Sequence, residues 1–269
     1  MQTPINRLPP DDCKKLRIYL LGRFQVLRDG EPMGFGRKLP KKPLSVLKWL
    51  TAAAGQSTDV LVIADRIWPD LEGDAARRAF DIALYRLRKI LGVRGLLVLA
   101  GGRLSIDSAK CWIDVCEFAA TVEKIEHVMA APSQAGDAEC KMLAEDLLAL
   151  YSGHLLESET QEDWVIPCRD QLLEKFRRAV LNLAACLEHH KRWDLAAALY
   201  TRALELDNLA EPLYRRLMLC YRELGETAEA LRVFRRCRDL LSVVLSTSPS
   251  AETRAVHATL AYRFAGKPE

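Results

Sequence analysis

Two stretches in the second half of the chain repeat one pattern at a separation of 34 residues. They are KRWDLAAALYTRALELD (191–207) and GETAEALRVFRRCRDLL (225–241). Ala196 matches Ala230, and Tyr200 matches Phe234. Small residues let the two helices of one repeat approach closely, and large residues fill the seam between repeats. This repeat predicts a stack of paired helices.

The first half of the chain has a different organisation. LRIYLLGRFQVLRDGEPMGF (16–35) has short apolar runs and an Asp29-Gly30 turn signal, so we expect a small antiparallel sheet. Two helices should follow, LSVLKWLTAAA and DVLVIADRIW, the second capped by Thr58 and stopped by Pro69. A third helix, 74–91, ends before Gly92, and LLVLAGGRLSID (96–107) predicts a hairpin.

Charge is divided between the two halves. Residues 16–109 hold 16 Lys+Arg against 9 Asp+Glu, a net of +7, whereas residues 110–269 hold 20 against 25, a net of −5. Residues 1–15 add +1 and are expected to form a flexible leader. A basic half beside an acidic half suggests two domains with different partners. The partner of the basic first domain would be a polyanion.

Composition excludes some classes of protein. No apolar run has the length of a membrane span, and the first 15 residues lack the apolar core of a signal peptide, so we expect a cytoplasmic protein without a membrane partner. The eight cysteines stand singly, with no CxxC pair, which favours buried thiols over a zinc site. Phosphate-binding, nucleophile-elbow, zinc-protease and dinucleotide motifs are absent from the sequence. We therefore expect no enzyme activity, no cofactor and no metal.

The helix expected over 74–91, DAARRAFDIALYRLRKILG with its terminal glycine, has one residue that does not fit an ordinary amphipathic pattern. At 100° per residue one apolar stripe faces a core, made by Ala76, Phe80, Ala83, Leu84, Leu87 and Leu91. Ile82 lies on the opposite side, among arginines. A single exposed isoleucine is common in proteins, and it can equally belong to a surface that contacts another polymer.

Taken together, the sheet, three helices and hairpin of residues 16–109 resemble a winged helix-turn-helix of the OmpR/PhoB type. LRIYLLGRFQV, YRLRKILG and GGRLSI carry this resemblance, in the form found in bacterial antibiotic regulatory proteins of the SARP class. Residues 111–265 resemble the bacterial transcriptional activator domain that follows the winged helix in these regulators, through DLLALYSGHLLES and EDWVIPCRDQLLEKFRRAVLNLA. The 34-residue period is that of tetratricopeptide (TPR) repeats. The expected fold is therefore mainly α with a small β component, a winged helix-turn-helix followed by a TPR-like helical domain.

The resemblance assigns DNA contacts to helix 74–91 and to the 96–107 wing. It puts four residues on sites that face the major groove: Arg78, Asp81, Ile82 and Arg86. There an apolar side chain contacts thymine methyl groups and an arginine binds a guanine edge. Asp81 accepts from a cytosine amino group or holds Arg78 or Arg86 in place. Tyr85 would stack on a sugar or bind a phosphate.

Other basic residues are assigned to the DNA backbone. Arg77, Arg88 and Lys89 would contact phosphates or remain solvated charges, and Lys42 would do the same or be idle. Arg103, in the wing, would enter the adjacent minor groove. Gly102 stands where the family often has an aromatic residue.

The resulting hypothesis is a sequence-specific transcriptional activator. The resemblance implies double-stranded DNA as partner, side-by-side binding at promoter direct repeats as a homodimer or oligomer, and contact with RNA polymerase. Two alternatives stay open. The chain can be chiefly a protein-interaction module, through its repeats or the acidic turn WPDLEGD (68–74), or it can be the output end of a longer sensor regulator.

Overall fold

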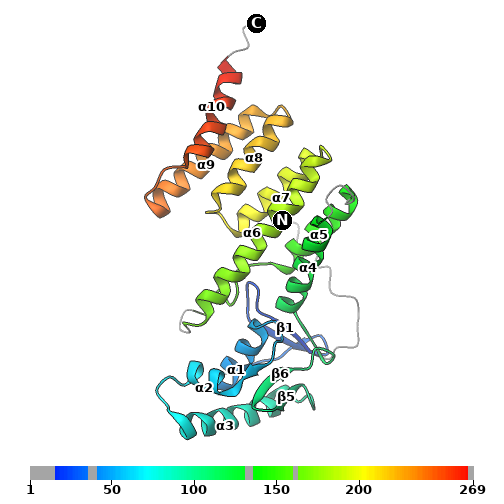
Figure 1. Cartoon of the computed structure of the whole chain (residues 1–269), viewed down its shortest axis with the longest axis vertical. Coiled ribbons are helices and arrows are strands. Elements are labelled where there is room, and N and C mark those ends of the chain that lie inside the picture. Colours follow the sequence, from blue (N-terminus) through cyan, green and yellow to red (C-terminus); the bar gives the residue numbers. More distant parts are fainter. Residues whose placement is uncertain (1–15, 36–40, 131–135, 160–162, 266–269) are drawn as a thin grey trace. The chain divides into compact units, whose positions relative to one another are not determined.

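The computed structural model describes residues 16–35, 41–130, 136–159 and 163–265 (Figure 1). The chain divides into two compact units. The first holds Met1–Ala120 and Ala149–Leu172, and the second holds Thr121–Leu148 and Leu173–Glu269. The fold is mainly helical with a small sheet component, as the sequence predicts. No helix in the described ranges has the length and apolar character needed to cross a membrane.

Two small sheets and three helices make up most of the first unit. The first sheet has the order β3-β2-β1-β7 and the second has the order β4-β6-β5. The strands are β1 (Leu16–Tyr19), β2 (Gln25–Arg28), β3 (Glu31–Pro32), β4 (Thr58–Asp59), β5 (Leu97–Ala100), β6 (Arg103–Ile106) and β7 (Cys111–Ile113). The helices are α1 (Lys41–Ala52), α2 (Val60–Ile67) and α3 (Gly73–Leu91). The three helices pack on one another and lie beside the β5–β6 hairpin in Figure 1.

The predicted turns and the third helix are confirmed. Asp29 and Gly30 join β2 to β3, and Gly101 and Gly102 join β5 to β6, all four with positive φ. Such paired positive φ values match the twist of a tight antiparallel hairpin. The helix predicted over 74–91 is α3, one residue longer at its start.

The start of α2 differs from the prediction. The residue that caps α2 is Asp59, whose carboxylate accepts the N–H of Leu61 at 2.8 Å, and not Thr58. Thr58 lies in β4 and pairs with Leu104 of β6. Pairing with a strand 46 residues away fixes Thr58 in an extended conformation, and no local signal in the sequence indicates that pairing.

The second unit consists of helices in the described residues. Four helices lie within it, α7 (Trp193–Leu206), α8 (Glu211–Glu223), α9 (Thr227–Leu245) and α10 (Ala251–Ala265). Most of α5 (Asp137–Leu150) and parts of α4 (Asp114–Met129) and α6 (Val165–His189) also belong to it. α7 packs on α8 and α8 on α9, as the repeat predicts. Ala196 and Ala230 are both fully buried at matching places in α7 and α9.

One cysteine pair contradicts the expectation of thiols only. Cys140 of α5 and Cys186 of α6 form a disulfide with Cα atoms 6.8 Å apart. The two residues are 46 positions apart and share no motif. Their proximity arises from the tertiary fold and has no local signal in the sequence. Five other described cysteines form no disulfide, Cys111, Cys116, Cys168, Cys220 and Cys237, and Cys13 lies outside the described residues.

Part of the chain after residue 110 belongs to the first compact unit. β7 pairs parallel with β1, with Cys111 opposite Leu16 and Ile113 opposite Ile18, so these residues complete the first sheet. Within the same unit, the N–H of Leu156 donates to the carbonyl of Leu20 at 2.8 Å. Residues 149–172 thus belong to the first unit although they follow α4 and α5 in the chain.

A close backbone approach explains the Ser152-Gly153 pair of this segment. The N–H of Gly22 donates to the carbonyl of His154 at 2.9 Å, and the Ser152 hydroxyl donates to the carbonyl of Leu21 at 2.8 Å. A Cβ on Gly153 would lie 2.7 Å from the Cα of Gly22. Only glycine therefore fits at position 153 without displacing the β1–β2 turn.

Asp114 joins the end of β1 to the start of α4. Its buried carboxylate accepts the N–H groups of Leu20 at 2.6 Å and Leu21 at 2.8 Å, and that of Val115 at 2.8 Å. Burial raises the pKa of Asp114 to about 6, although these hydrogen bonds favour the anion.

Replacing Asp114 with alanine is expected to destabilise the first unit. The change leaves the buried N–H groups of Leu20 and Leu21 without their acceptor, which should lower the free energy of unfolding by about 3 kcal/mol. Urea denaturation followed by circular dichroism measures this loss. Glu123→Ala, at an exposed position of the same helix, serves as the control and should leave the midpoint nearly unchanged. Equal midpoints for the two variants would contradict this role for Asp114.

The pH dependence of stability offers an independent test. Because the pKa of Asp114 is raised to about 6 in the folded protein, the folded state holds this proton more tightly than the unfolded chain, where aspartate titrates near about 3.9. The stabilisation is complete below about pH 4 and is lost as pH rises through about 6. Asp114→Asn has no proton to lose. The difference in unfolding free energy between wild type and this variant should therefore change between pH 4 and 7, and a constant difference would refute the assignment.

Candidate nucleic-acid interface

The outward face of α3 is the strongest candidate for a functional surface in the first unit. The residues of the predicted apolar stripe are all buried. The opposite face carries exposed side chains from Arg78, Asp81, Ile82, Tyr85, Arg86 and Lys89. Ile82 is 54% exposed and Tyr85 is 59% exposed, so the isoleucine is not absorbed by packing within the protein. The structure thus brings six predicted site residues onto one helix face.

Some charged side chains on or beside this face contact one another. The Arg77 guanidinium pairs with the Asp81 carboxylate at 3.3 Å, one helical turn away. The Lys89 ammonium lies 5.0 Å from the centre of the Tyr85 ring, and its interaction with Tyr85 raises the pKa of Lys89. The sequence predicts that Asp81 accepts from a cytosine or holds Arg78 or Arg86; within the protein its ion-pair partner is Arg77. Arg78 and Arg86 form no ion pair or hydrogen bond with any other residue in the described ranges, so their guanidinium groups are available for an external partner.

Two residues expected to contact DNA outside α3 bind within the protein. The Lys42 ammonium donates to the carbonyl of Ile67 at the end of α2 and lies 5.9 Å from the centre of the Trp68 ring. A cation at this place satisfies an unpaired carbonyl and favours the negative end of the helix dipole. Arg103, after the Gly101-Gly102 turn, donates to the carbonyl of Ser57 and to its hydroxyl at 3.0 Å.

Two arginines hold the end of α3 in place, a role that the sequence does not predict for them. Arg28 of β2 donates to the carbonyl of Ile90 at 2.8 Å and also to that of Leu91. Arg88, expected to meet phosphate or solvent, donates to the carbonyl of Leu97 at the start of β5 at 3.0 Å. These bonds fasten the last turn of α3 to both sheets. No sequence signal predicts these hydrogen bonds, because each acceptor is a backbone carbonyl. The carbonyls that Arg28 reaches are more than 60 residues away, and the one that Arg88 reaches depends on the path of the loop after α3.

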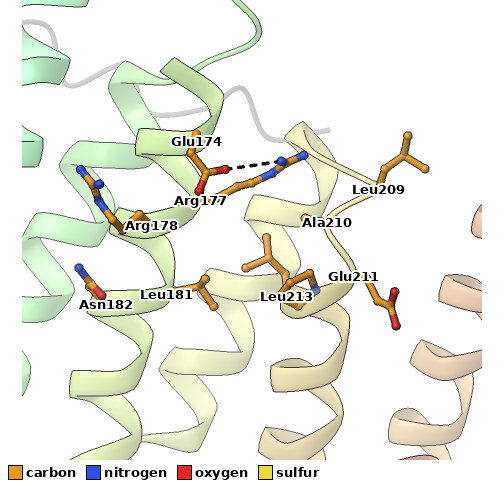
Figure 2. Close-up of a pocket in the computed structure, with 10 residues that line it drawn as sticks. Glu174, Arg177, Arg178, Leu181, Asn182, Leu209, Ala210, Glu211 and Leu213 are labelled. Atoms are coloured by element: carbon orange, nitrogen blue, oxygen red, sulfur yellow. Dashed lines mark ion pairs between the residues drawn. The ribbon is translucent and has the colours of Figure 1, made fainter. Parts of the chain in front are cut away.

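The second unit contains a hollow of about 390 Å³ between α6 and the start of α8 (Figure 2). Leu181 and Leu213 lie on its two sides, and Arg177 extends across it toward the turn before α8. Its arginines are matched by carboxylates: Arg177 binds Asp207 and lies 3.8 Å from Glu174, and Arg178 binds Glu126 at 2.6 Å. The hollow is therefore a largely apolar recess with a neutralised rim, and its charges do not indicate an anion site.

The two adjacent histidines are possible metal ligands. His189 and His190 are neighbours with ring centres 5.5 Å apart. Within the described residues no group of three or more His, Cys, Asp or Glu side chains is arranged to hold a metal ion.

Comparison with known proteins gives one family match. The sequence model of the bacterial transcriptional activator domain matches residues 113–261, more than half of the chain. No curated protein matches the chain.

Two solved structures are similar to this one. Mycobacterium tuberculosis EmbR, in complex with a low-affinity phosphopeptide, matches with a TM-score of 0.69 and 24% identity, over 95% of this chain and 66% of the EmbR chain. The present chain thus spans slightly less than two thirds of EmbR, and the match establishes a shared fold. The C-terminal TPR-containing domain of an FK506-binding protein from Plasmodium falciparum matches with a TM-score of 0.38 and 14% identity, over 57% of this chain and 91% of that one. The second likeness is too low to support an argument.

The end of α3 gives a test of how this helix is supported. Gly92 has φ +62° and a Cβ there would lie 3.0 Å from Nη2 of Arg28, whereas Gly101 has φ +56° with open space around it. Alanine at either position pays the left-handed backbone cost of about 1–2 kcal/mol. Gly92→Ala should lose more stability than Gly101→Ala in urea denaturation, because it also displaces Arg28. Equal losses would mean that the Arg28 contact contributes nothing.

Proposed function

The chain belongs to the bacterial transcriptional activator domain family, and we propose that it is a sequence-specific DNA-binding regulator that activates transcription. Residues 16–109 would be its winged helix-turn-helix domain, with α3 as the recognition helix. The β5–β6 hairpin would be the wing. The observation that carries the proposal is the exposed Ile82 on a helix face with two arginines, Arg78 and Arg86, that no described residue neutralises.

The chemistry of this face suits the edges of base pairs. An exposed aliphatic side chain is a natural contact for a thymine methyl group, and an unpaired arginine can donate two hydrogen bonds to guanine. Ile82 and Arg86 are four residues apart, one helical turn, so both can reach neighbouring base pairs. Arg77 and Asp81 neutralise each other at the edge of the face, and Asp81 is then less free to accept from cytosine.

Backbone contacts would come from the remaining cations. Lys89, held charged beside Tyr85, suits a phosphate at the end of α3. Arg103 can reach a minor groove only by leaving Ser57, because its guanidinium donates hydrogen bonds to the hydroxyl and the carbonyl of that residue. Lys42 supports α2 through the Ile67 carbonyl, so its removal should alter DNA binding through the position of α2 more than through lost charge.

Resemblance to SARP-class regulators supports the finer parts of the proposal. The regulator would bind direct repeats side by side as a homodimer or oligomer and would contact RNA polymerase. The turn at residues 68–74 is a suitable polymerase contact, because Leu71 is exposed there among acidic residues. We also propose that the protein acts in the cytoplasm and has no enzymatic activity.

A second function is favoured by the recess between α6 and α8 (Figure 2). Its apolar walls at Leu181 and Leu213 suit an apolar side chain of a partner protein. The second unit would then act chiefly as an interaction module. Binding to DNA is strongly dependent on salt, whereas capture of a partner in an apolar recess is not, and this difference separates the two functions.

Selection of binding sites from randomised duplex DNA tests the main proposal. The wild-type chain should enrich one motif, arranged as a direct repeat. Ile82→Ala should lose preference at a thymine position, and Arg86→Ala at a guanine position. Each lost contact should cost about 1–3 kcal/mol, or roughly 5- to 150-fold in relative affinity.

Matched controls come from the second unit. Val243→Ala removes an exposed aliphatic side chain and Arg235→Ala an exposed arginine, and neither should change the motif. If the folded wild-type protein enriches no motif at low salt, recognition by α3 is wrong. If both pairs of variants change the motif equally, the assignment to Ile82 and Arg86 is wrong.

A further inference from the structure

The disulfide between Cys140 and Cys186 is enclosed within the second unit. Cys140 is fully buried on α5, and Cys186 is 4% exposed on α6. The bond closes a loop of 46 residues, which contains the whole segment between these two helices. A disulfide of this kind stabilises the folded state mainly by reducing the conformational entropy of the unfolded chain.

Apart from this bond, α5 buries few side chains within the second unit. Only Cys140, Ala144 and Leu147 of α5 are buried, whereas six residues of α7 are buried. The ion pair between Asp137 and Arg192 at 2.6 Å is solvent-exposed on both sides. Exposed ion pairs contribute little to stability. One of the three buried contacts of α5 is therefore the cross-linked cysteine itself, and the bond is a major part of what holds the helix.

A lasting disulfide is unexpected in the compartment in which a DNA-binding protein works. The proposed function places the chain with DNA, where cellular thiols keep cysteines reduced, and the disulfides that do form there are usually transient and redox-sensing. We propose that Cys140 and Cys186 form a reversible redox clamp that fixes α5 on α6 when oxidised and releases α5 when reduced. This inference goes beyond DNA recognition and would give the second unit two states.

The chemistry is thiol–disulfide exchange with the glutathione pool. A glutathione thiolate attacks one sulfur of the bridge, the other cysteine leaves as a thiolate and takes up a proton, and a mixed disulfide forms. A second glutathione thiolate then attacks the mixed disulfide, releasing the second protein thiol and glutathione disulfide. The net reaction converts one protein disulfide and two glutathiones into two protein thiols and one glutathione disulfide. Oxidation by glutathione disulfide is the reverse.

Two other cysteines of the second unit are not part of the bridge and are poor partners for exchange. Cys220 and Cys237 are buried, and desolvation raises the pKa of each thiol to about 11, so little thiolate is present for exchange. Because the bridge is also buried, attack on it requires α5 to open. The exchange should therefore be slow, and its rate should follow the local opening of α5.

Labelling of thiols in denaturant tests whether the clamp exists. The full chain, equilibrated with glutathione disulfide or with excess reduced glutathione, is unfolded under acid quench and alkylated, and its intact mass is measured. The chain has eight cysteines, so the oxidised form should take six labels and the reduced form eight. Cys140→Ser and Cys186→Ser should each abolish this difference, and Cys237→Ser should retain it. Eight labels on wild type under both conditions would overturn the proposal.

Hydrogen exchange tests whether the bond controls α5. Peptides covering 137–150 should exchange roughly tenfold or more faster in the reduced wild-type chain than in the oxidised chain, whereas peptides from α8 should not change. Cys140→Ser should match the reduced wild type in either buffer. Identical exchange of α5 in the two wild-type forms would overturn the clamp, and this comparison does not depend on the variants folding. Neither readout uses DNA, so a failure here is distinguishable from a failure of the proposed function.

Discussion

The carboxylate of Asp114 is the interaction on which the arrangement of the first unit depends. It accepts the N–H groups of Leu20 and Leu21 where β1 ends, and it begins α4 through Val115. Water is excluded from this site, so these backbone donors have no alternative partner and the position of β1 relative to α4 is fixed. The parallel pairing of β1 with β7 and the return of residues 149–172 to Leu20–Gly22 follow from the same junction.

Hydrogen bonds from side chains to backbone groups also position the proposed recognition helix. Arg28 satisfies two carbonyls at the end of α3, Arg88 joins that end to β5, and Lys42 donates to the carbonyl of Ile67 at the end of α2. Three cations of the first unit thus donate to backbone carbonyls that fix the ends of these helices. The exposed face of α3 also carries Ile82 together with Arg78 and Arg86, whose guanidinium groups pair with no described residue. Rigid support beneath a few exposed side chains suits recognition of a defined partner.

The sequence predicted what depends on local periodicity and turn chemistry. The two faces of α3, the Gly92 terminus and both tight hairpins follow from spacing and from positive-φ residues, and the structure confirms them. It could not predict contacts between distant segments. Thr58, predicted to cap α2, lies in β4 and pairs with Leu104. Asp81 pairs with Arg77, and Cys140 bonds to Cys186 across 46 positions of the sequence. The exposed face of the site was therefore predictable from local spacing, whereas the pairing of its charges was not.

The salt dependence of binding to duplex DNA is the most direct measurement of the central claim, that α3 and the β5–β6 hairpin form a DNA-binding surface. Affinity of the full chain would be measured by fluorescence anisotropy over a range of salt concentrations. We expect log affinity to fall linearly with log salt, and the slope to decrease by about 1 for Lys89→Ala but not for Arg235→Ala. Binding that is absent, or that does not change with salt, would contradict the account and leave the second unit as the functional part of the chain.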